Sequence, residues 1–221
     1  MIVIGDVHGQ YDLLIKLMYK LPHDNLCFVG DLIDRGEKSK DVVELIIKNK
    51  YKCVMGNHEK FMVLSYDDNK FVNHDVYEVW EKNGGQKTIN SYCKNGDINF
   101  DLFFEHRGWM KNLPLIFSYD FKTFVSHSKC LPFFNKEIDE DIKNNILWSR
   151  LHSEHCCPDY FINIHGHTIT FNIFNDNGYI NIDTGAYTHG KLSAYDIEEK
   201  CVYSVSECKY PSDKQFEKFY L

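Results

Sequence analysis

The first third of the chain alternates apolar runs with amphipathic stretches. Residues 2–4, 26–29 and 51–55 are short apolar runs with the length and composition of buried strands. Between them, residues 11–21 and 40–49 carry apolar side chains at the three- and four-residue spacing of a helix. This order of strand, helix, strand, helix and strand, with short connections, predicts a parallel sheet with helices packed against it.

The rest of the chain follows other patterns. Residues 58–112 are rich in aromatic side chains and are expected to be helical. The segment 115–128 predicts a hairpin, and the Asn-Gly pair at 177–178, between two apolar runs, predicts another. Two more antiparallel strands are expected at 192–197 and 201–205. A parallel half would thus precede an antiparallel half, which indicates an α/β (α+β) fold of two packed sheets with helices outside.

Composition limits the class of protein. The 221 residues include 16 Phe and 14 Tyr but only 5 Pro, which suits one well-filled core and argues against linkers. We therefore expect one domain over residues 1–221. The net charge of −7 argues against a nucleic-acid partner, and the lack of any run of 18 apolar residues argues against a membrane span.

The N-terminus and the cysteines bear on the cellular compartment. The sequence begins MIVIGDVHG, without the basic region, long apolar run and cleavage site of a signal peptide. The eight cysteines are scattered, and Cys27 and Cys53 fall inside predicted core strands. Both observations favour reduced thiols and a cytoplasmic location. The sequence carries no signal for an oligomeric state.

Polar motifs directly follow the predicted strands. The first three strands run into GDVHG (5–9), GDLIDRG (30–36) and GNHE (56–59), and later strands end at His127 and at HGHT (165–168). The carboxyl ends of parallel strands meet in one crevice, so these strand ends would bring their Asp, Asn and His side chains together. Each motif alone is more often a turn or a buried histidine, but their recurrence after apolar strands favours a functional site.

The side chains in these motifs suit two metal ions. Carboxylate, amide oxygen and imidazole donors favour Mn, Fe or Zn over Ca or Mg, and no cysteine lies at the strand ends. We expect two divalent cations, Mn²⁺ first, with Fe or Zn as alternatives. The expected ligands are Asp6, His8 and His167 for one ion and Asn57 and His127 for the other, with Asp31 as the bridge between them.

Together the five motifs resemble the signature of the phosphoprotein-phosphatase branch of the calcineurin-like metallophosphoesterases: GDVHG, GDLIDRG, GNHE, VSH and HGHT. The likeness is greatest to the compact bacterial and lambda-type bacteriophage serine/threonine protein phosphatases, and it spans Asp6 to about Gly185. It implies a calcineurin-like fold, with two mixed β-sheets packed as a sandwich, flanked by helices. It also implies the same metal ligands, a phosphoric-ester hydrolase, and a phosphorylated protein or peptide as substrate.

The other polar residues of the motifs fit a hydrolytic mechanism. Two metals lower the pKa of a bridging water, so we expect direct attack of hydroxide on phosphorus. His58 would protonate the leaving oxygen, and Asp34 would orient His58. Arg35 would hold the phosphoryl group, and Arg150 would do the same by resemblance to the family's Trp-x-Arg element, although its local sequence favours a surface salt bridge. Asn57 is expected to contact substrate as well as metal.

Three other functions stay open from the sequence. A small-molecule or nucleic-acid phosphodiesterase is a weaker option than a dinucleotide hydrolase. A symmetrical diadenosine tetraphosphate hydrolase carries a very similar motif set, but such enzymes are usually longer. A non-catalytic scaffold would not need an intact set of ligands and an intact acid, so it is disfavoured.

Four further features have less specific interpretations. The Gly84-Gly85 pair is expected to form a turn near the site or a plain helix break. The tail from residue 209 is a docking segment or a surface helix. The stretch HSEHCC (152–157) is expected to be a loop rather than a zinc cluster. Lys129 would assist phosphate binding or restrict entry.

Overall fold

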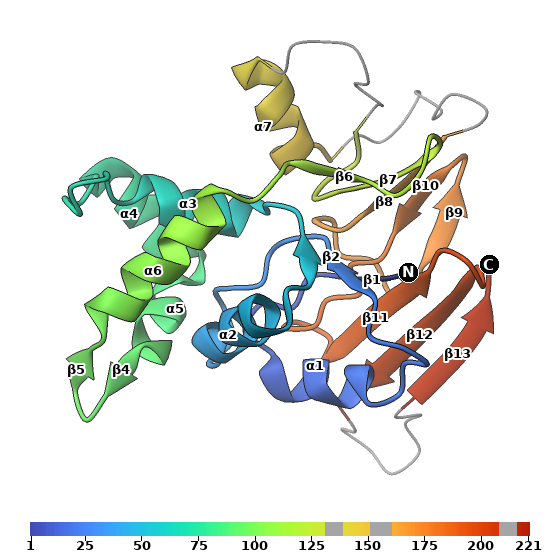
Figure 1. The fold of residues 1–221 in the computed structure, drawn as a ribbon, viewed down its shortest axis with the longest axis horizontal. Helices are drawn as coiled ribbons and strands as arrows, with labels where there is room; N and C mark the ends of the chain where they lie inside the picture. Colours follow the sequence, from blue (N-terminus) through green and yellow to red (C-terminus); the bar gives the residue numbers. More distant parts are fainter. Residues whose placement is uncertain (131–138, 151–160, 208–215) are drawn as a thin grey trace.

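The computed structural model describes residues 1–130, 139–150, 161–207 and 216–221 (Figure 1). The first of its two large sheets has six strands: β1 (Ile2–Ile4), β2 (Leu26–Phe28), β3 (Lys52–Cys53), β11 (Lys191–Asp196), β12 (Cys201–Ser206) and β13 (Phe216–Tyr220). Their order is β13-β12-β11-β1-β2-β3, with β1, β2 and β3 parallel and the other pairs antiparallel. The parallel sheet predicted from the first third of the chain is confirmed.

The second sheet is mixed rather than antiparallel. Its strands are β6 (Ile116–Ser118), β7 (Thr123–Ser126), β8 (Ile162–His165), β9 (Phe174–Asp176) and β10 (Tyr179–Asn181), in the order β6-β7-β8-β10-β9. Both predicted hairpins, β6–β7 and β9–β10, are confirmed. The pairs β7–β8 and β8–β10 are parallel, so the expectation of an antiparallel half is wrong for this sheet. The antiparallel strands expected at 192–197 and 201–205 are confirmed as β11 and β12. The hydrophobic pattern identifies a strand but not its partner, because long-range packing chooses the partner.

The two sheets pack face to face over an apolar layer. Val3 and Val29 from the first sheet lie in one buried cluster with Val125, Ile164 and Ile180 from the second. Burying one such side chain fully contributes about 1.5–3 kcal/mol. This layer holds the two sheets together, and it thereby sets where the loops at the strand ends lie.

Helices surround the sandwich (Figure 1). They are α1 (Tyr11–Met18), α2 (Ser39–Asn49), α3 (Asn57–Leu64), α4 (His74–Trp80), α5 (Gln86–Ser91), α6 (Phe100–Lys111) and α7 (Glu140–Trp148). The buried leucines of α1 pack with the first sheet, and Ile146 of α7 packs against Phe124 of β7. No helix in the described part of the chain is both long and apolar enough to cross a membrane.

The middle of the chain is helical, as predicted, with two additional features. A π-helical turn at Glu81–Gly85 joins α4 to α5, at the interruption expected from the two glycines. A short hairpin of β4 (Cys93–Lys94) and β5 (Asp97–Ile98) precedes α6 and was not predicted. Its strands have two residues each, too few for an alternating pattern to be recognised.

The C-terminal end forms an edge strand instead of a surface helix. β13 pairs antiparallel with β12, from Val205 opposite Phe216 to Cys201 opposite Tyr220. Residues 208–215 of the tail and the HSEHCC stretch at 152–157 lie outside the described residues.

Candidate active site

The loops that follow five strands meet at one end of the sandwich. Loops after β1 and β2 and the first turn of α3, which follows β3, carry three of the motifs, and the segments at the ends of β7 and β8 carry the other two. The side chains brought together there are Asp6, His8, Asp31, Asp34, Arg35, Asn57, His58, His127 and His167. All are buried except Arg35 and His167, which are half-buried. The predicted convergence of the strand ends is therefore present in the fold.

Several of these residues have left-handed backbone conformations, which non-glycine residues rarely adopt. The angle φ is 46° at His8, 47° at Asp31, 71° at Asp34, 66° at Arg35 and 69° at His167. Each such conformation costs about 1–3 kcal/mol and persists only where the surrounding structure stabilises it. Their concentration in these loops indicates that the strain serves a function.

Asp31 lies at the centre of the crevice. Its Oδ2 is 3.5 Å from His8 Nε2 and 3.9 Å from His58 Nε2, and its Oδ1 is 3.4 Å from His127 Nε2. Burial alone would raise the pKa of Asp31, but the surrounding histidines hold that pKa below its ordinary value. The carboxylate is therefore charged and faces imidazoles on both sides, as a bridging ligand must.

Asn57, His127 and His167 form a second group beside Asp31. Asn57 Oδ1 lies 2.7 Å from His127 Nε2 and 3.0 Å from His167 Nδ1, and these two nitrogens are 3.2 Å apart. The expectation that His167 would lie with Asp6 and His8 is wrong for its imidazole. Its backbone N–H does reach that side and donates to Asp6 Oδ2 at 3.1 Å. Sequence spacing could not show that the imidazole and the backbone N–H of His167 point to different groups, because both directions depend on the turn at this residue.

The imidazole nitrogens are arranged to bind cations. His8 Nδ1 and His127 Nδ1 lie 2.8 Å and 2.9 Å from backbone carbonyl oxygens, to which each Nδ1–H donates. Burial lowers the pKa of both rings, so they are neutral and Nε2 carries a lone pair. The lone pair of His127 Nε2 then faces two acceptor oxygens, Asn57 Oδ1 and Asp31 Oδ1, a repulsive arrangement that a divalent cation would relieve.

The donors present fit two ions. Two groups share Asp31, one with His8 and His58 and one with His127 and His167, and the donor atoms of each lie within 4.8 Å of one another. Burial and the nearby carboxylates of Asp183 and Asp31 raise the pKa of Asp6, which a neighbouring cation would reverse.

Asp34 and His58 form a tight pair next to this centre. His58 Nδ1 lies 2.5 Å from Asp34 Oδ2. Trp80 Nε1–H donates to the same oxygen at 2.9 Å, and the Thr88 hydroxyl donates to Asp34 Oδ1 at 2.6 Å. Burial would lower the pKa of His58, but the carboxylates of Asp31 and Asp34 raise it overall, which favours a protonated ring. Trp80 and Thr88 escaped the sequence analysis because neither belongs to a motif.

A cavity of about 320 Å³ opens onto the centre. Its lining is Asp31, Arg35, Asn57, His58, Asn83, Trp148, Arg150, His167, Thr168, Ile169 and Tyr187. Arg150 is exposed, lines this cavity and forms no salt bridge with a described carboxylate, so the surface-pair interpretation finds no support among those residues. The cavity thus contains both arginines that were predicted to hold phosphate.

The turn at Gly84-Gly85 lies against the site, as expected. Gly84 has φ of 105°, and a Cβ there would come within 2.8 Å of the Arg35 nitrogen. The Arg35 N–H donates to the Gly84 carbonyl at 3.4 Å. Only glycine permits this close approach, so the turn supports the strained backbone of Arg35.

Comparison with known proteins identifies the family. Residues 1–182 match the model of the calcineurin-like phosphoesterases. The chain belongs to this family. It is therefore a metallophosphoesterase and a hydrolase of phosphoric esters, and the resemblance inferred from the motifs is confirmed.

Two relatives of this phosphoesterase have different substrates in their names. Serine/threonine-protein phosphatase 2 of Escherichia coli is 30% identical over 89% of this chain and 92% of its own length. The asymmetrical bis(5′-nucleosyl)-tetraphosphatase PrpE of Oceanobacillus iheyensis is 29% identical over 92% and 91%. A crystal structure of a candidate diadenosine tetraphosphatase superposes with a TM-score of 0.66 at 19% identity, covering 95% of this chain and 94% of that one, which confirms the fold.

Two buried acids of this calcineurin-like phosphoesterase were missed by the sequence analysis. The Glu59 carboxylate accepts from the backbone N–H groups of Asp31 at 2.8 Å, Leu32 at 2.9 Å and Gly56 at 2.9 Å. It therefore ties the second motif to the third. Asp183 accepts from Gly185 N–H at 2.9 Å, and burial raises its pKa to about 7. The fourth position of GNHE was a signal for Glu59. The signal for Asp183 was its place after the apolar run 179–182 and before Thr184-Gly185, the same strand-end position as the other motifs.

Lys129 does not serve the cavity in either way that was expected. Its ammonium group lies 3.9 Å from the centre of the Tyr179 ring and 3.7 Å from Asp176 Oδ2. Lys129 is buried and is absent from the lining of the cavity.

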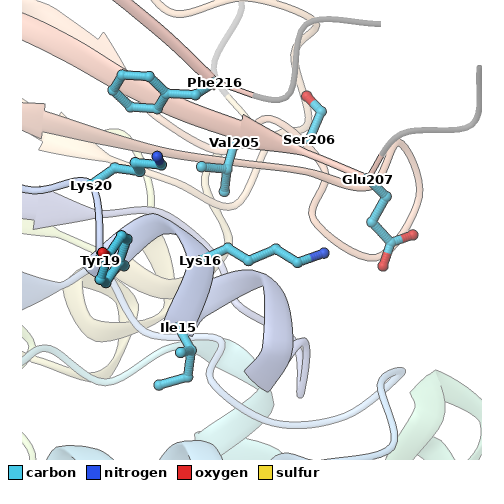
Figure 2. A pocket seen from close by; sticks show the side chains of 8 residues that line it. All are labelled: Ile15, Lys16, Tyr19, Lys20, Val205, Ser206, Glu207 and Phe216. Atoms are coloured by element: carbon cyan, nitrogen blue, oxygen red, sulfur yellow. The ribbon is translucent and has the colours of Figure 1, made fainter. Parts of the chain in front are cut away.

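A larger groove of about 690 Å³ lies elsewhere, between α1 and the β12–β13 edge (Figure 2). Its lining is Ile15, Lys16, Tyr19, Lys20, Val205, Ser206, Glu207 and Phe216. Among the described residues, its lining has no histidine and a single carboxylate, so these residues form no group of metal ligands.

Proposed function

We propose that the protein is a metal-dependent serine/threonine protein phosphatase. The observation that carries this proposal is one cavity, lined by Asp31, His58, His167 and two arginines, that opens onto both groups of metal donors and onto the Asp34–His58 pair. A relative of matching length with the same named activity supports the phosphoprotein substrate. Mn²⁺ is the proposed ion, and a cytoplasmic location stays our expectation.

The proposed ligands divide into two sets around Asp31. Asp6, His8 and Asp31 would hold one cation, and Asp31, Asn57, His127 and His167 the other. When bound, such cations make water nucleophilic near neutral pH and neutralise charge on the phosphoryl oxygens.

The remaining residues act on the substrate. Arg35 and Arg150 would hold the phosphoryl oxygens through paired N–H donors, since a planar guanidinium matches the geometry of phosphate. His58 would donate its proton to the departing serine or threonine oxygen. Asp34 holds Nδ1–H of that ring, so that Nε2 points into the cavity, and it stabilises the imidazolium form.

A dinucleoside tetraphosphatase is the second candidate function. It is favoured by the tetraphosphatase relative, which matches the chain over a comparable length. The same residues would then cleave a phosphoanhydride, and the position of cleavage would distinguish the two forms. Symmetrical cleavage of diadenosine tetraphosphate yields two ADP, and asymmetrical cleavage yields ATP and AMP.

The deciding experiment compares substrates on one preparation. Metal-stripped protein is reloaded with Mn²⁺, and kcat/KM is measured on a phosphoserine peptide and on diadenosine tetraphosphate. A much larger value on the peptide would support the phosphatase. Preference for the dinucleotide would replace the proposal with the second candidate. Inactivity on both, with two metals bound per chain, would refute both substrate assignments.

A further inference from the structure

Arg35 is held without a carboxylate partner. Its guanidinium forms no salt bridge within 4.0 Å among the residues that the structure describes. Its contacts are Nη1 to His8 Nε2 at 3.1 Å and the ring of Tyr187, whose centre lies 4.3 Å from Cζ. A half-buried arginine is usually fixed by an acid, and here an aromatic face takes that place.

Tyr187 is well placed to hold this group. It belongs to the loop between β10 and β11, is half-buried and lines the cavity. The loop turns at Gly185, where φ is 75°, and the Gly185 carbonyl accepts from Thr188 and His189 N–H at 3.1 Å and 2.7 Å. The Tyr187 ring also meets the His8 ring edge-on, with centres 5.0 Å apart.

We infer that Tyr187 is a positioning residue that presents Arg35 to the phosphoryl group of the substrate. A carboxylate would hold Arg35 more firmly but would compete with phosphate for the same N–H donors. An aromatic face attracts the cation from one side and leaves these donors free. The inference rests on the proposed function of Arg35 but not on whether the substrate is a phosphoprotein or a dinucleotide.

Metal binding should make this contact more important. His8 Nε2, the atom that faces Arg35, is also the nitrogen proposed to bind a cation. A nitrogen that shares its lone pair with a metal cannot accept a hydrogen bond from Arg35. Among the described residues, the ring of Tyr187 is then the contact that still orients the guanidinium.

The test measures the binding of inorganic phosphate to the Mn²⁺-loaded protein by calorimetry. Tyr187→Leu removes the aromatic face at similar volume and should weaken phosphate affinity about 3–30-fold, which corresponds to the usual strength of such contacts. Tyr187→Phe keeps the face and should stay within about twofold. Tyr19→Leu is the matched control, since Tyr19 is 85% exposed, directly follows α1 and does not line the cavity.

A double-mutant cycle separates positioning from a structural role. In an Arg35→Ala background, Tyr187→Leu should change phosphate affinity by less than about twofold, because the group it orients is gone. The inference would be overturned if Tyr187→Leu weakened phosphate affinity equally with and without Arg35. It would also be overturned if Tyr187→Phe weakened phosphate affinity as much as Tyr187→Leu does. Loss of bound metal in Tyr187→Leu would overturn the inference as well. If Tyr187→Leu does not fold, Tyr187→Met replaces it as the non-aromatic variant. Turnover of p-nitrophenyl phosphate in the parent protein reports separately on the proposed function.

Discussion

The crevice at the strand ends and the groove beside α1 differ in both size and kind. The crevice measures about 320 Å³ and the groove about 690 Å³. In the crevice, buried acids and imidazoles from five loops face one another at short range. In the groove, side chains such as Tyr19, which is 85% exposed, extend into solvent from one helix and a sheet edge (Figure 2).

The difference shows that the reactive groups lie where loops converge and side chains are buried, and not where the larger hollow lies. A buried carboxylate such as Asp31 has lost its water and interacts strongly with any neighbouring charge. An exposed ammonium such as Lys16 is screened and has no comparable effect on its neighbours. The size of a hollow is therefore a poor guide to the site in this fold.

The largest effect should come from Asp31, which joins both metal groups. Asp31→Ala removes the shared carboxylate, so we expect the variant to lose both metals and its activity to fall to that of a buffer control. Metal content and phosphoester hydrolysis measure the two effects. Asp12→Ala, at an exposed acid of α1 that pairs with Lys38, is the control and should keep both properties. Full activity in Asp31→Ala would contradict the bridging role.

His58→Asn should separate acid catalysis from metal binding. We expect kcat on an alkyl phosphate to fall on the order of 10²–10³-fold, the usual contribution of a general acid. Two metals should remain bound, because His58 is not among the proposed ligands. Loss of metal in this variant, measured by elemental analysis, would show that His58 is a ligand instead.

Trp80→Phe tests the support beneath the catalytic pair. The change removes the N–H that donates to Asp34 at 2.9 Å, which should cost about 1–3 kcal/mol of unfolding free energy. A looser Asp34 would orient His58 less well, so kcat should fall about 10-fold. Chemical denaturation and steady-state kinetics measure these effects. Trp109→Phe on α6 is the matched control. An equal loss of unfolding free energy and of kcat in this control would contradict a specific role for Trp80.

The smallest effect should come from the groove. A double variant, Lys16→Ala with Lys20→Ala, removes its two lysines. Hydrolysis of p-nitrophenyl phosphate and thermal stability should change little, with kcat/KM within about twofold, because exposed charges contribute little to either. A larger drop in kcat/KM would mean that the exposed charges of the groove influence catalysis in the crevice.

Much of the fold could be predicted from local sequence patterns. The parallel strands β1, β2 and β3, the hairpin at Asn177-Gly178 and the helical middle were predicted because each depends on neighbouring residues. Asn177 and Gly178 both have positive φ, 51° and 87°, as the tight hairpin requires. The edge strand β13 and the parallel pairing of β7 with β8 were not predicted, because strand partners are chosen by contacts across the whole chain.

The sequence by itself determined most of the polar groups that meet at the strand ends, although not Asp183, Trp80 or Thr88. Each predicted metal donor follows an apolar strand closely, so local order was enough to select it as a candidate ligand. The tertiary structure alone decided how those groups are paired. It turned His167 toward Asn57, placed Trp80 and Thr88 on Asp34 from 46 and 54 residues away, and set Tyr187 against Arg35. Such contacts join distant segments, and the packing of helices and sheets, rather than any local pattern, brings those segments together.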